Sequence, residues 1–219
     1  MTRWAPARKD TLGALADEIL HNYSRGRVLV AIDGLDGSGA AEIADDVAEL
    51  IRAKGHGAFR ASIKDFARPR ELRYLKGADS PEGFYEDSYD YSVFRRVLVE
   101  PFRLGGSAGF VTSAFDIISD TQVEPKWLTG PDDAVLLVDG LFLNRPELAG
   151  AWNYSVWVDC AADVARERVL AEDGPTRLTN RYVGGQQLYL TKVSPRTRAV
   201  AILDNTDPNH PRRIFADSC

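Results

Sequence analysis

Apolar and polar residues follow two different periods along this chain of 219 residues. In residues 12–23 the apolar positions recur every three or four residues, which predicts an amphipathic helix. Asp10 or Thr11 can cap this helix at its start, and Gly26 can end it. Residues 28–32 are continuously apolar and rich in β-branched side chains, which is typical of a buried strand.

The same two patterns alternate along the rest of the chain. Helical spacing predicts further helices at 43–51 (ending near Gly55), 88–100 (before Pro101), 162–172 and 180–192. Short apolar runs predict further strands at 58–63, 134–139, 154–159 and 199–203. Residues 105–131 are irregular and have room for a small hairpin. No repeat or low-complexity linker divides the sequence, so we expect a single domain over residues 1–219.

This alternation predicts the fold class. Strands separated by helices favour a three-layer α/β fold, with a mainly parallel sheet and helices on both faces. In open sheets of this kind, ligands bind at the carboxyl ends of the strands. The residues that fall at such ends are Gly34, Lys64, Asp139 and Asp204.

Composition and charge exclude several classes of protein. The net charge of -5 provides no basic surface for nucleic acid, and no apolar run is long enough to cross a bilayer. Residues 1–6 lack the apolar core of a signal peptide. Cys160 and Cys219 are too few for a disulfide scaffold and are typical of a reducing cytoplasm. We therefore expect a cytoplasmic protein with a small-molecule ligand, and the sequence leaves a homo-oligomer open.

The most informative motif is the stretch GLDGSG at residues 34–39. Gly34 and Gly39 have the separation of the phosphate-binding pattern G-x-x-x-x-G-K-[ST], between a predicted strand and a predicted helix. The pattern continues with Lys and then Ser or Thr, but this chain has Ala40 and Ala41. A cation for the phosphates and a hydroxyl ligand for Mg²⁺ are therefore missing. Backbone N–H groups still attract an anion there, and a tight turn without a ligand is the alternative.

Asp139 closes a continuous apolar strand later in the chain. In phosphoryl-transfer enzymes an acid in this position holds Mg²⁺. Taken alone, Asp139 is better explained as a residue that caps the end of a strand. Its combination with the earlier glycine loop favours a nucleotide-binding fold.

Six stretches, in their order and spacing, carry a resemblance to a known family. They are AIDGLDGSG (31–39), SIKDFARPR (62–70), DSPEGFYEDSYDY (79–91), VLLVDGLFLNRPEL (135–148), NRYVGGQQLYL (180–190) and DNTD (204–207). Together they make residues 27–206 similar to bacterial uridine-kinase-type P-loop kinases, in the phosphoribulokinase and uridine kinase group. The resemblance implies a P-loop NTPase fold, ATP and Mg²⁺ as cofactors, and transfer of the γ-phosphate to the 5′-hydroxyl of a nucleoside.

The resemblance also implies roles for individual residues. Nucleotide binding is implied for Gly34, Asp36, Gly37, Ser38, Gly39 and, beside the adenine, Asn205. Contacts with the nucleoside are implied for Asp79, Phe84, Phe115 and Tyr182. Asp139 would be the metal ligand, and Arg168 would be the first arginine of a lid region at about residues 166–185. Simple core packing is the alternative for Phe84 and Tyr182, and a solvated helix position is the alternative for Arg168.

The departures from the family pattern are concentrated where the chemistry takes place. Lys64 stands where the family has the Asp that accepts the proton of the attacking hydroxyl. Glu172 stands near the second lid arginine, and Asp120 falls where classical uridine kinases have a His that reads uracil. Lys64 could instead supply the cation that position 40 lacks, or it could be an ordinary exposed lysine. We therefore expect Lys64, Asp139 and Arg168 to be the remaining catalytic groups, with activity weak or lost.

Three functions are compatible with these residues. The chain could be a weakened or rewired nucleoside-kinase-like enzyme, a non-catalytic pseudokinase that binds a nucleotide or nucleoside, or an interaction domain with an empty crevice. ATP affinity separates the third function from the others, and phosphate transfer to a nucleoside panel separates the first from the second. Ala40 and Ala41 could also have been introduced by engineering, to inactivate an enzyme. Such a change would not also require Lys64 and Glu172, so these two residues argue against an engineered origin.

Overall fold

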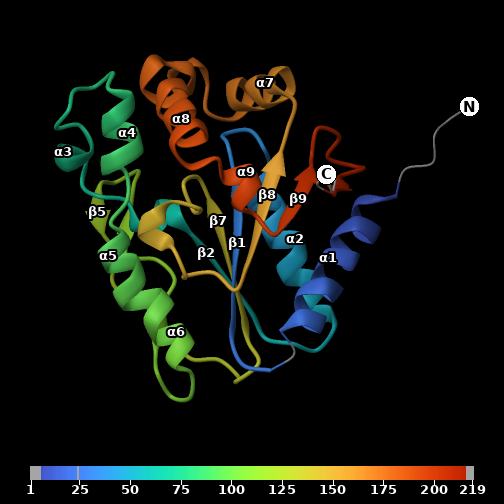
Figure 1. Cartoon of the computed structure of the whole chain (residues 1–219). Coiled ribbons are helices and arrows are strands. Elements are labelled where there is room, and N and C mark those ends of the chain that lie inside the picture. Colours follow the sequence, from blue (N-terminus) through green and yellow to red (C-terminus); the bar gives the residue numbers. More distant parts are fainter. Residues whose placement is uncertain (1–5, 24, 216–219) are drawn as a thin grey trace, which may run out of the picture.

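A computed structural model describes residues 6–23 and 25–215, in which helices cover both faces of a central sheet (Figure 1). The sheet has six strands in the order β10-β9-β8-β1-β7-β2. These strands are β1 (Val28–Gly34), β2 (Ala58–Ser62), β7 (Val135–Gly140), β8 (Tyr154–Asp159), β9 (Ala201–Asp204) and β10 (Arg212–Ile214). All neighbouring pairs are parallel except β10 with β9. The predicted α/β fold with a mainly parallel sheet is confirmed.

The remaining elements precede and connect these strands. The α-helices are α1 (Arg8–Asn22), α2 (Ala40–Ala53), α3 (Arg70–Arg73), α4 (Pro81–Asp87), α5 (Tyr91–Phe94), α6 (Glu100–Leu104), α7 (Ala162–Glu172), α8 (Asn180–Val193) and α9 (Pro195–Arg198). Short helical segments of other types are η1 (Ile63–Phe66), η2 (Arg95–Val99), η3 (Pro146–Leu148) and η4 (Pro175–Leu178). None of the helices in the described ranges combines the length and the apolar character needed to cross a bilayer.

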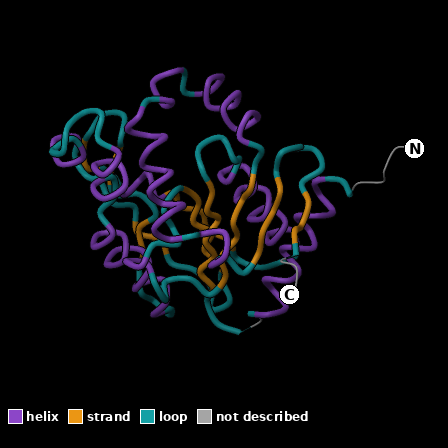
Figure 2. The backbone as a smooth tube through the Cα atoms, turned by 45° about the horizontal axis from the view of Figure 1, so that its top comes forward, coloured by secondary structure: helices purple, strands orange, loops and turns teal. Residues whose placement is uncertain are grey.

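The two faces of β1 pack into two different cores. Val28, Val30 and Ile32 belong to a core that also contains apolar residues of α1 and α2. Leu29 and Ala31 belong to the opposite core, with aromatic residues of α4, α5, α6 and α8. Because side chains alternate between the faces of a strand, a strand buried on both faces must be apolar throughout, as the run 28–32 is. Figure 2 shows the strands enclosed between these two groups of helices.

The expected capping of the first helix is wrong. α1 begins at Arg8 with Ala7 as its N-cap, and no side chain caps it. Thr11 therefore lies inside the first turns, and its hydroxyl donates to the Pro211 carbonyl at 2.8 Å. The helix also ends at Asn22, before Gly26 is reached. A partner 200 positions away cannot be inferred from local sequence.

The helix expected at 88–100 is displaced and longer. It begins at Tyr91, after the N-cap Asp90, and continues as α5, η2 and α6 through Pro101 to Leu104. A proline ring clashes with a carbonyl of the preceding turn in a regular α-helix. The π-helical segment η2 directly precedes α6 and widens that turn, so the chain continues past Pro101.

The irregular region and the chain ends also differ from expectation. Two antiparallel pairs take the place of one hairpin, and they are formed by β3 (Phe110–Val111) with β6 (Trp127–Leu128) and by β4 (Phe115–Asp116) with β5 (Thr121–Gln122). The last predicted strand begins only at Ala201, and β10 follows it unpredicted. Cys219 and residues 1–5 of the expected non-signal N-terminus lie outside the described residues.

Candidate functional site

The glycine loop lies between β1 and α2, as predicted. Gly37 and Gly39 have φ values of 76° and 82°, in the left-handed region that favours glycine. A Cβ atom at Gly37 would lie 2.2 Å from the Ala165 carbonyl oxygen, and one at Gly39 would lie 2.4 Å from Nδ2 of Asn205. Both the backbone conformation and the close approach of neighbouring segments therefore require glycine at these two positions.

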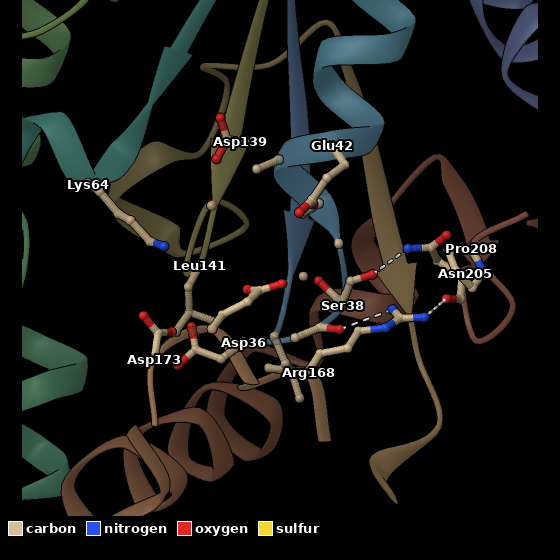
Figure 3. Close-up of a pocket in the computed structure, with 18 of the residues that line it drawn as sticks. Asp36, Ser38, Glu42, Lys64, Asp139, Leu141, Arg168, Asp173, Asn205 and Pro208 are labelled. Atoms are coloured by element: carbon tan, nitrogen blue, oxygen red, sulfur yellow. Dashed lines mark hydrogen bonds between the residues drawn. The ribbon is translucent and has the colours of Figure 1, made fainter. Parts of the chain in front are cut away.

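Two side chains bind carbonyl groups of the loop. Arg168 Nη1 donates to the Gly37 carbonyl at 3.2 Å, and Asn205 Nδ2 donates to the Ser38 carbonyl at 2.7 Å (Figure 3). The first amides of α2 have no carbonyl partner within the helix, and they carry the positive end of its dipole. The loop and the first residues of α2 line a cavity of about 500 Å³, where the positive end of the helix favours an anion.

Arg168 binds several backbone carbonyls around this loop. Besides Gly37, its Nη2 donates to the carbonyls of Asn205 and Thr206, both at 3.0 Å. Asn205 itself is 2 % exposed. These contacts link α7 and the turn after β9 to the glycine loop, so Arg168 positions the loop in this structure.

Asp36 connects the loop with the segment expected to be a lid. Its carboxylate pairs with Arg177 Nη2 at 3.1 Å and accepts a hydrogen bond from Gln186 Nε2 at 3.2 Å. The Asp36 amide also donates to Oε1 of Gln186 at 2.9 Å. The sequence analysis did not single out Arg177, because its partner lies 141 positions away.

Asp139 lies at the end of β7, beside the glycine loop, and is paired with an arginine of β2. Arg60 Nη2 lies 2.8 Å from Oδ1 of Asp139, and the two side chains are 19 % and 9 % exposed. Ser62 Oγ donates to the other carboxylate oxygen at 3.1 Å. Arg60 Nη2 also reaches the Ala41 carbonyl at 3.3 Å, and its Nε reaches Asp45 at 2.8 Å. Sequence reasoning missed Arg60, although a charged residue within a short strand was a visible signal.

These residues do not fit a Mg²⁺ ion. Mg²⁺ in P-loop kinases is held by a Ser or Thr hydroxyl and an acid. Position 41 is alanine, and Asp139 is already neutralised by Arg60. In the described ranges, no three acids, histidines or cysteines are grouped so that they could hold a metal. The Arg60 guanidinium therefore occupies the side of Asp139 at which a metal ion would need an open carboxylate oxygen.

The cavity in front of the glycine loop is acidic. Its cationic side chains are Arg8, Lys64 and Arg168, and its carboxylates are Asp36, Glu42, Asp139, Glu172 and Asp173. Figure 3 shows Lys64 pointing into the cavity from the side opposite Asn205. Lys64 lies in η1, directly after β2, as the sequence predicted. A polyphosphate bound here would depend on the backbone amides and on this lysine.

A second cavity, of about 190 Å³, adjoins the first. Lys64 and Asp173 line both. Phe84 and Tyr182, expected at the nucleoside, form one wall of the second cavity with their ring centroids 4.8 Å apart. The other lining residues include Arg73, Tyr74, Ile117, Arg177 and Arg181.

Three further residues singled out from the sequence lie elsewhere. Asp79 is exposed and lines neither of these cavities. Phe115 is a buried residue of β4 and lines a separate hollow. Asp120 accepts from the Arg70 amide at 2.9 Å and pairs with Arg73 at 2.9 Å. Asp120 therefore holds an arginine of the second cavity in place.

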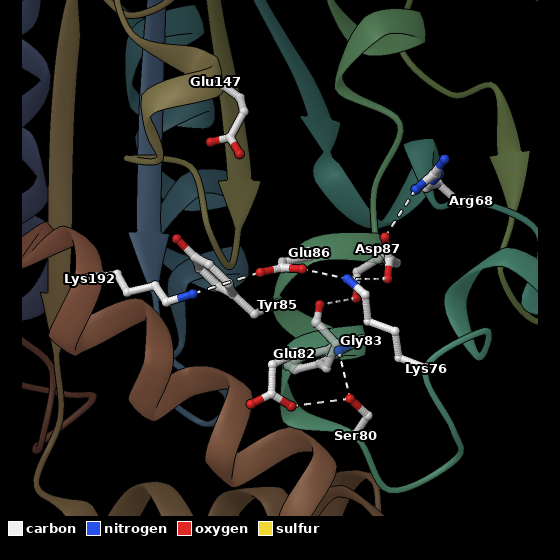
Figure 4. A network of polar contacts seen from close by, with 12 residues as sticks. Arg68, Lys76, Ser80, Glu82, Gly83, Tyr85, Glu86, Asp87, Glu147 and Lys192 are labelled. Carbon is white, nitrogen blue, oxygen red and sulfur yellow. Dashed lines mark hydrogen bonds and ion pairs between the residues drawn. The ribbon is translucent and has the colours of Figure 1, made fainter.

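A network of ion pairs fixes α4, which carries Phe84, against α8 (Figure 4). Lys192 of α8 lies 3.7 Å from Glu86, which also pairs with Lys76. Lys76 in turn lies 3.1 Å from Asp87. α8 packs closely against α4 here: a Cβ atom at Gly185 would lie only 2.6 Å from the Phe84 ring.

A buried acid lies beneath the glycine loop. Asp33 is 0 % exposed and accepts hydrogen bonds from the Tyr189 hydroxyl and from Asn144 Nδ2 at 2.7 Å. Burial raises the pKa of Asp33 from 3.8 to about 6, against the hydrogen bonds from Tyr189 and Asn144, which lower it. The sequence gave no sign of this group, since its partners come from distant segments.

Comparison with known proteins shows which fold this arrangement belongs to. No protein-family model and no curated protein matches the sequence. A possible uridine kinase from Bacillus stearothermophilus matches in structure, with a TM-score of 0.72 and 23% identity, over 89% of this chain and 97% of that chain. The chain has the fold of the uridine-kinase-like P-loop kinases.

Two other structures extend this likeness. A proposed fructose transport system kinase from a Silicibacter species matches with a TM-score of 0.66 and 20% identity, over 80% of this chain and 92% of that chain. D-glycerate 3-kinase from Cryptococcus neoformans matches with a TM-score of 0.53 and 9% identity, over 83% of this chain and 86% of that chain. At these identities the likeness shows the fold and leaves the substrate open.

Proposed function

We propose that this chain is a kinase-like protein with two adjoining ligand sites. A nucleotide would place its phosphates at the 34–39 loop, and a small hydroxyl compound, a nucleoside by resemblance, would occupy the second cavity. The observation that supports this most directly is that Lys64 and Asp173 line both cavities. Two ligands that meet at a shared wall satisfy the proximity that group transfer requires. Residues 166–185, which contribute to both cavities, would form the lid.

We propose that phosphoryl transfer is weak or lost. The loop has alanine at positions 40 and 41, and Lys64 has no lone pair to accept a proton while it is charged. Each missing group costs roughly 10²–10³ in rate, by analogy with oxyanion-hole donors. A pseudokinase that binds nucleotide without turnover is the second candidate. The Arg60–Asp139 ion pair favours the pseudokinase, because the carboxylate that would hold a metal is already paired with a guanidinium.

Calorimetric titration with ADP, in EDTA and in Mg²⁺, tests the binding part of the proposal. We expect weak binding that is the same in both buffers, because no metal ligand is free. Gly37→Ala should abolish it, since the new Cβ would collide with the Ala165 carbonyl. Gly150→Ala is the matched control, because Gly150 also has a positive φ of 71° and nothing within 4 Å of its Cβ position.

Transfer from radiolabelled ATP to a panel of nucleosides tests the catalytic part. Turnover near background is expected. Rapid turnover would refute the loss of activity and leave the binding proposal standing. Failure of ADP to bind in either buffer would refute the nucleotide site itself and favour an interaction domain.

A further inference from the structure

The two adjoining cavities differ in charge. The cavity at the glycine loop has an excess of carboxylates, whereas the second cavity is lined by the cations Lys64, Arg73, Arg177 and Arg181 and by the single carboxylate Asp173. A pocket for a neutral nucleoside needs no such excess of positive charge. The distribution therefore points to a negatively charged group on the ligand of the second cavity.

Arg181 is the clearest case of an uncompensated charge. It is 3 % exposed, and its terminal nitrogens donate only to carbonyls: that of Arg73 at 2.7 Å and those of Gly77 and Ser80, both at 3.3 Å. Its buried Nε has no hydrogen-bond partner, and no carboxylate within the described ranges pairs with it. Removing a guanidinium from water is costly unless an anion compensates its charge.

The other cations of the cavity divide into two kinds. Arg177 is paired with Asp36 at 3.1 Å, and Arg73 is paired with Asp120 at 2.9 Å. Lys64 forms neither an ion pair nor a side-chain hydrogen bond in residues 6–23 and 25–215. The lysine and the buried guanidinium of α8 therefore leave two positive charges beside the same small cavity.

Two of the guanidinium groups of this cavity lie over tyrosine rings. The Arg181 guanidinium lies 4.2 Å from the ring centroid of Tyr74, and the Arg177 guanidinium lies 4.3 Å from that of Tyr182. Burial raises the pKa of Tyr182, but the Tyr74 hydroxyl and the two guanidinium groups lower it by more, so it falls below 10.0. The hydrogen bond with Tyr182 and burial raise the pKa of Tyr74, and burial raises that of Tyr89, which also lines the cavity.

We propose that the second cavity binds a small hydroxyl compound that carries a phosphate monoester, with the phosphate facing Arg181 and Lys64. The planar guanidinium and the flexible ammonium are the two side chains best suited to phosphate oxygens. The inference rests on the proposed function, since it names the chemical class of the second ligand at the same two-cavity site. It replaces a neutral nucleoside by a phosphorylated one, or by a sugar phosphate of similar size.

Calorimetry with matched pairs of compounds tests this proposal. The probes are uridine 5′-monophosphate against uridine, and ribose 5-phosphate against ribose, each titrated with and without saturating ADP. We expect each phosphorylated compound to bind about tenfold or more tightly than its neutral counterpart, because hydrogen bonds between charged groups contribute more than neutral ones. The preference should persist with ADP present, which separates the second cavity from the glycine loop.

Neighbouring isoleucines provide a matched pair of variants that avoids the buried arginine. Ile117 lines the second cavity and is 38 % exposed, so Ile117→Glu should fold and place a carboxylate at its mouth. Ile118 is 94 % exposed and does not line the cavity, so Ile118→Glu adds the same charge without facing it. We expect Ile117→Glu to weaken binding of the phosphorylated compounds at least about fivefold and Ile118→Glu to leave it unchanged.

The outcomes separate this proposal from the proposed function. Equal affinity for the phosphorylated and neutral compounds, or no binding of either, overturns the phosphate site even when ADP binds. Equal effects of the two isoleucine variants overturn it as well, because the anion would then bind elsewhere. A phosphate preference that Ile117→Glu removes, in a protein that does not bind ADP, supports the site and refutes the nucleotide proposal.

Discussion

The ion pair between Arg60 and Asp139 leads to a prediction about both stability and metal binding. Arg60→Gln keeps a polar side chain of moderate length but removes the charge that faces the carboxylate. Asp139 would then keep its negative charge at 9 % side-chain exposure, with only Ser62 Oγ at 3.1 Å as a donor. A buried carboxylate without a counter-ion is strongly destabilising, and a metal ion could supply the missing charge.

The magnitudes follow from burial and size. Removing one partner of a largely buried pair costs about 3 kcal/mol, at the low end of measured values because Arg60 is partly exposed. For a chain of this length, that loss lowers the melting temperature by about 6–12 °C. If Mg²⁺ binds the freed Asp139 with a dissociation constant of about 1 mM, then about 10 mM Mg²⁺ restores about 1.4 kcal/mol of the loss.

Thermal unfolding measured by circular dichroism checks this, with NaCl of matched ionic strength in place of MgCl₂. Arg196→Gln is the control variant, because Arg196 lies 2.8 Å from Asp159 but the two side chains are 47 % and 30 % exposed. Exposed pairs contribute only about 0–1 kcal/mol, so this control should lose little stability. Mg²⁺ should stabilise Arg60→Gln and have no effect on the wild type or on Arg196→Gln.

Two results would refute the reasoning. If Arg60→Gln and Arg196→Gln melt at the same temperature, Asp139 does not depend on Arg60 for its counter-charge. If Mg²⁺ stabilises the wild type as much as the variant, Arg60 does not occupy the metal's place. In that second case, the double variant Ala40→Lys and Ala41→Thr, with Arg60 unchanged, should bind Mg²⁺–ADP at least about tenfold more tightly than the wild type.

Three further predictions concern packing, pH and nucleotide binding. In urea titrations, Gly185→Ala should lower the free energy of unfolding by about 1–3 kcal/mol, because the new Cβ would meet the Phe84 ring. Gly13→Ala, whose new Cβ would have nothing within 4 Å, should raise the free energy of unfolding by up to about 1 kcal/mol. The pKa of Asp33 is raised from 3.8 to about 6, so Asp33 contributes about 3 kcal/mol of stability below pH 4, and this contribution is lost as the pH rises to 6. Asp33→Asn should therefore flatten the dependence of the unfolding free energy on pH between pH 4 and 6. An unaltered slope would contradict this. Lys64→Ala should abolish residual ADP binding in calorimetry, because Lys64 is a cation of an acidic cavity and has no ion-pair partner among residues 6–23 and 25–215. Unchanged affinity would mean that the amides bind the phosphates alone.

The fold could be predicted because it depends on local patterns. A strand buried on both faces must be apolar throughout, and the run 28–32 meets this condition. The glycine loop was recognisable because Gly34 and Gly39 have the spacing of the phosphate-binding pattern, and the backbone at Gly39 requires glycine. The ends of helices were less predictable, since Pro101 inside a helix depends on a π-helical turn that no local rule signals.

The charges of the site could not be assigned in this way. Arg60 pairs with Asp139 across 79 positions, and Arg177 pairs with Asp36 across 141. Such pairs depend on which strands and helices become neighbours, and the residue types alone fit many arrangements. For the same reason, the buried position of Arg181 within α8 could not be distinguished from an exposed one.

The substitutions at positions 40 and 41 acquire a physical meaning once these charges are placed. The loop has alanine at positions 40 and 41, and Arg60 supplies a counter-charge to the nearby Asp139 from the neighbouring strand. This ion pair keeps the acid from being a buried charge without a partner, and it leaves Asp139 no open position for a metal. Positive charge is then available mainly on the far side of Lys64, at Arg181 and its neighbours. With the charges placed in this way, we expect the second cavity to attract a phosphate group more strongly than the glycine loop does.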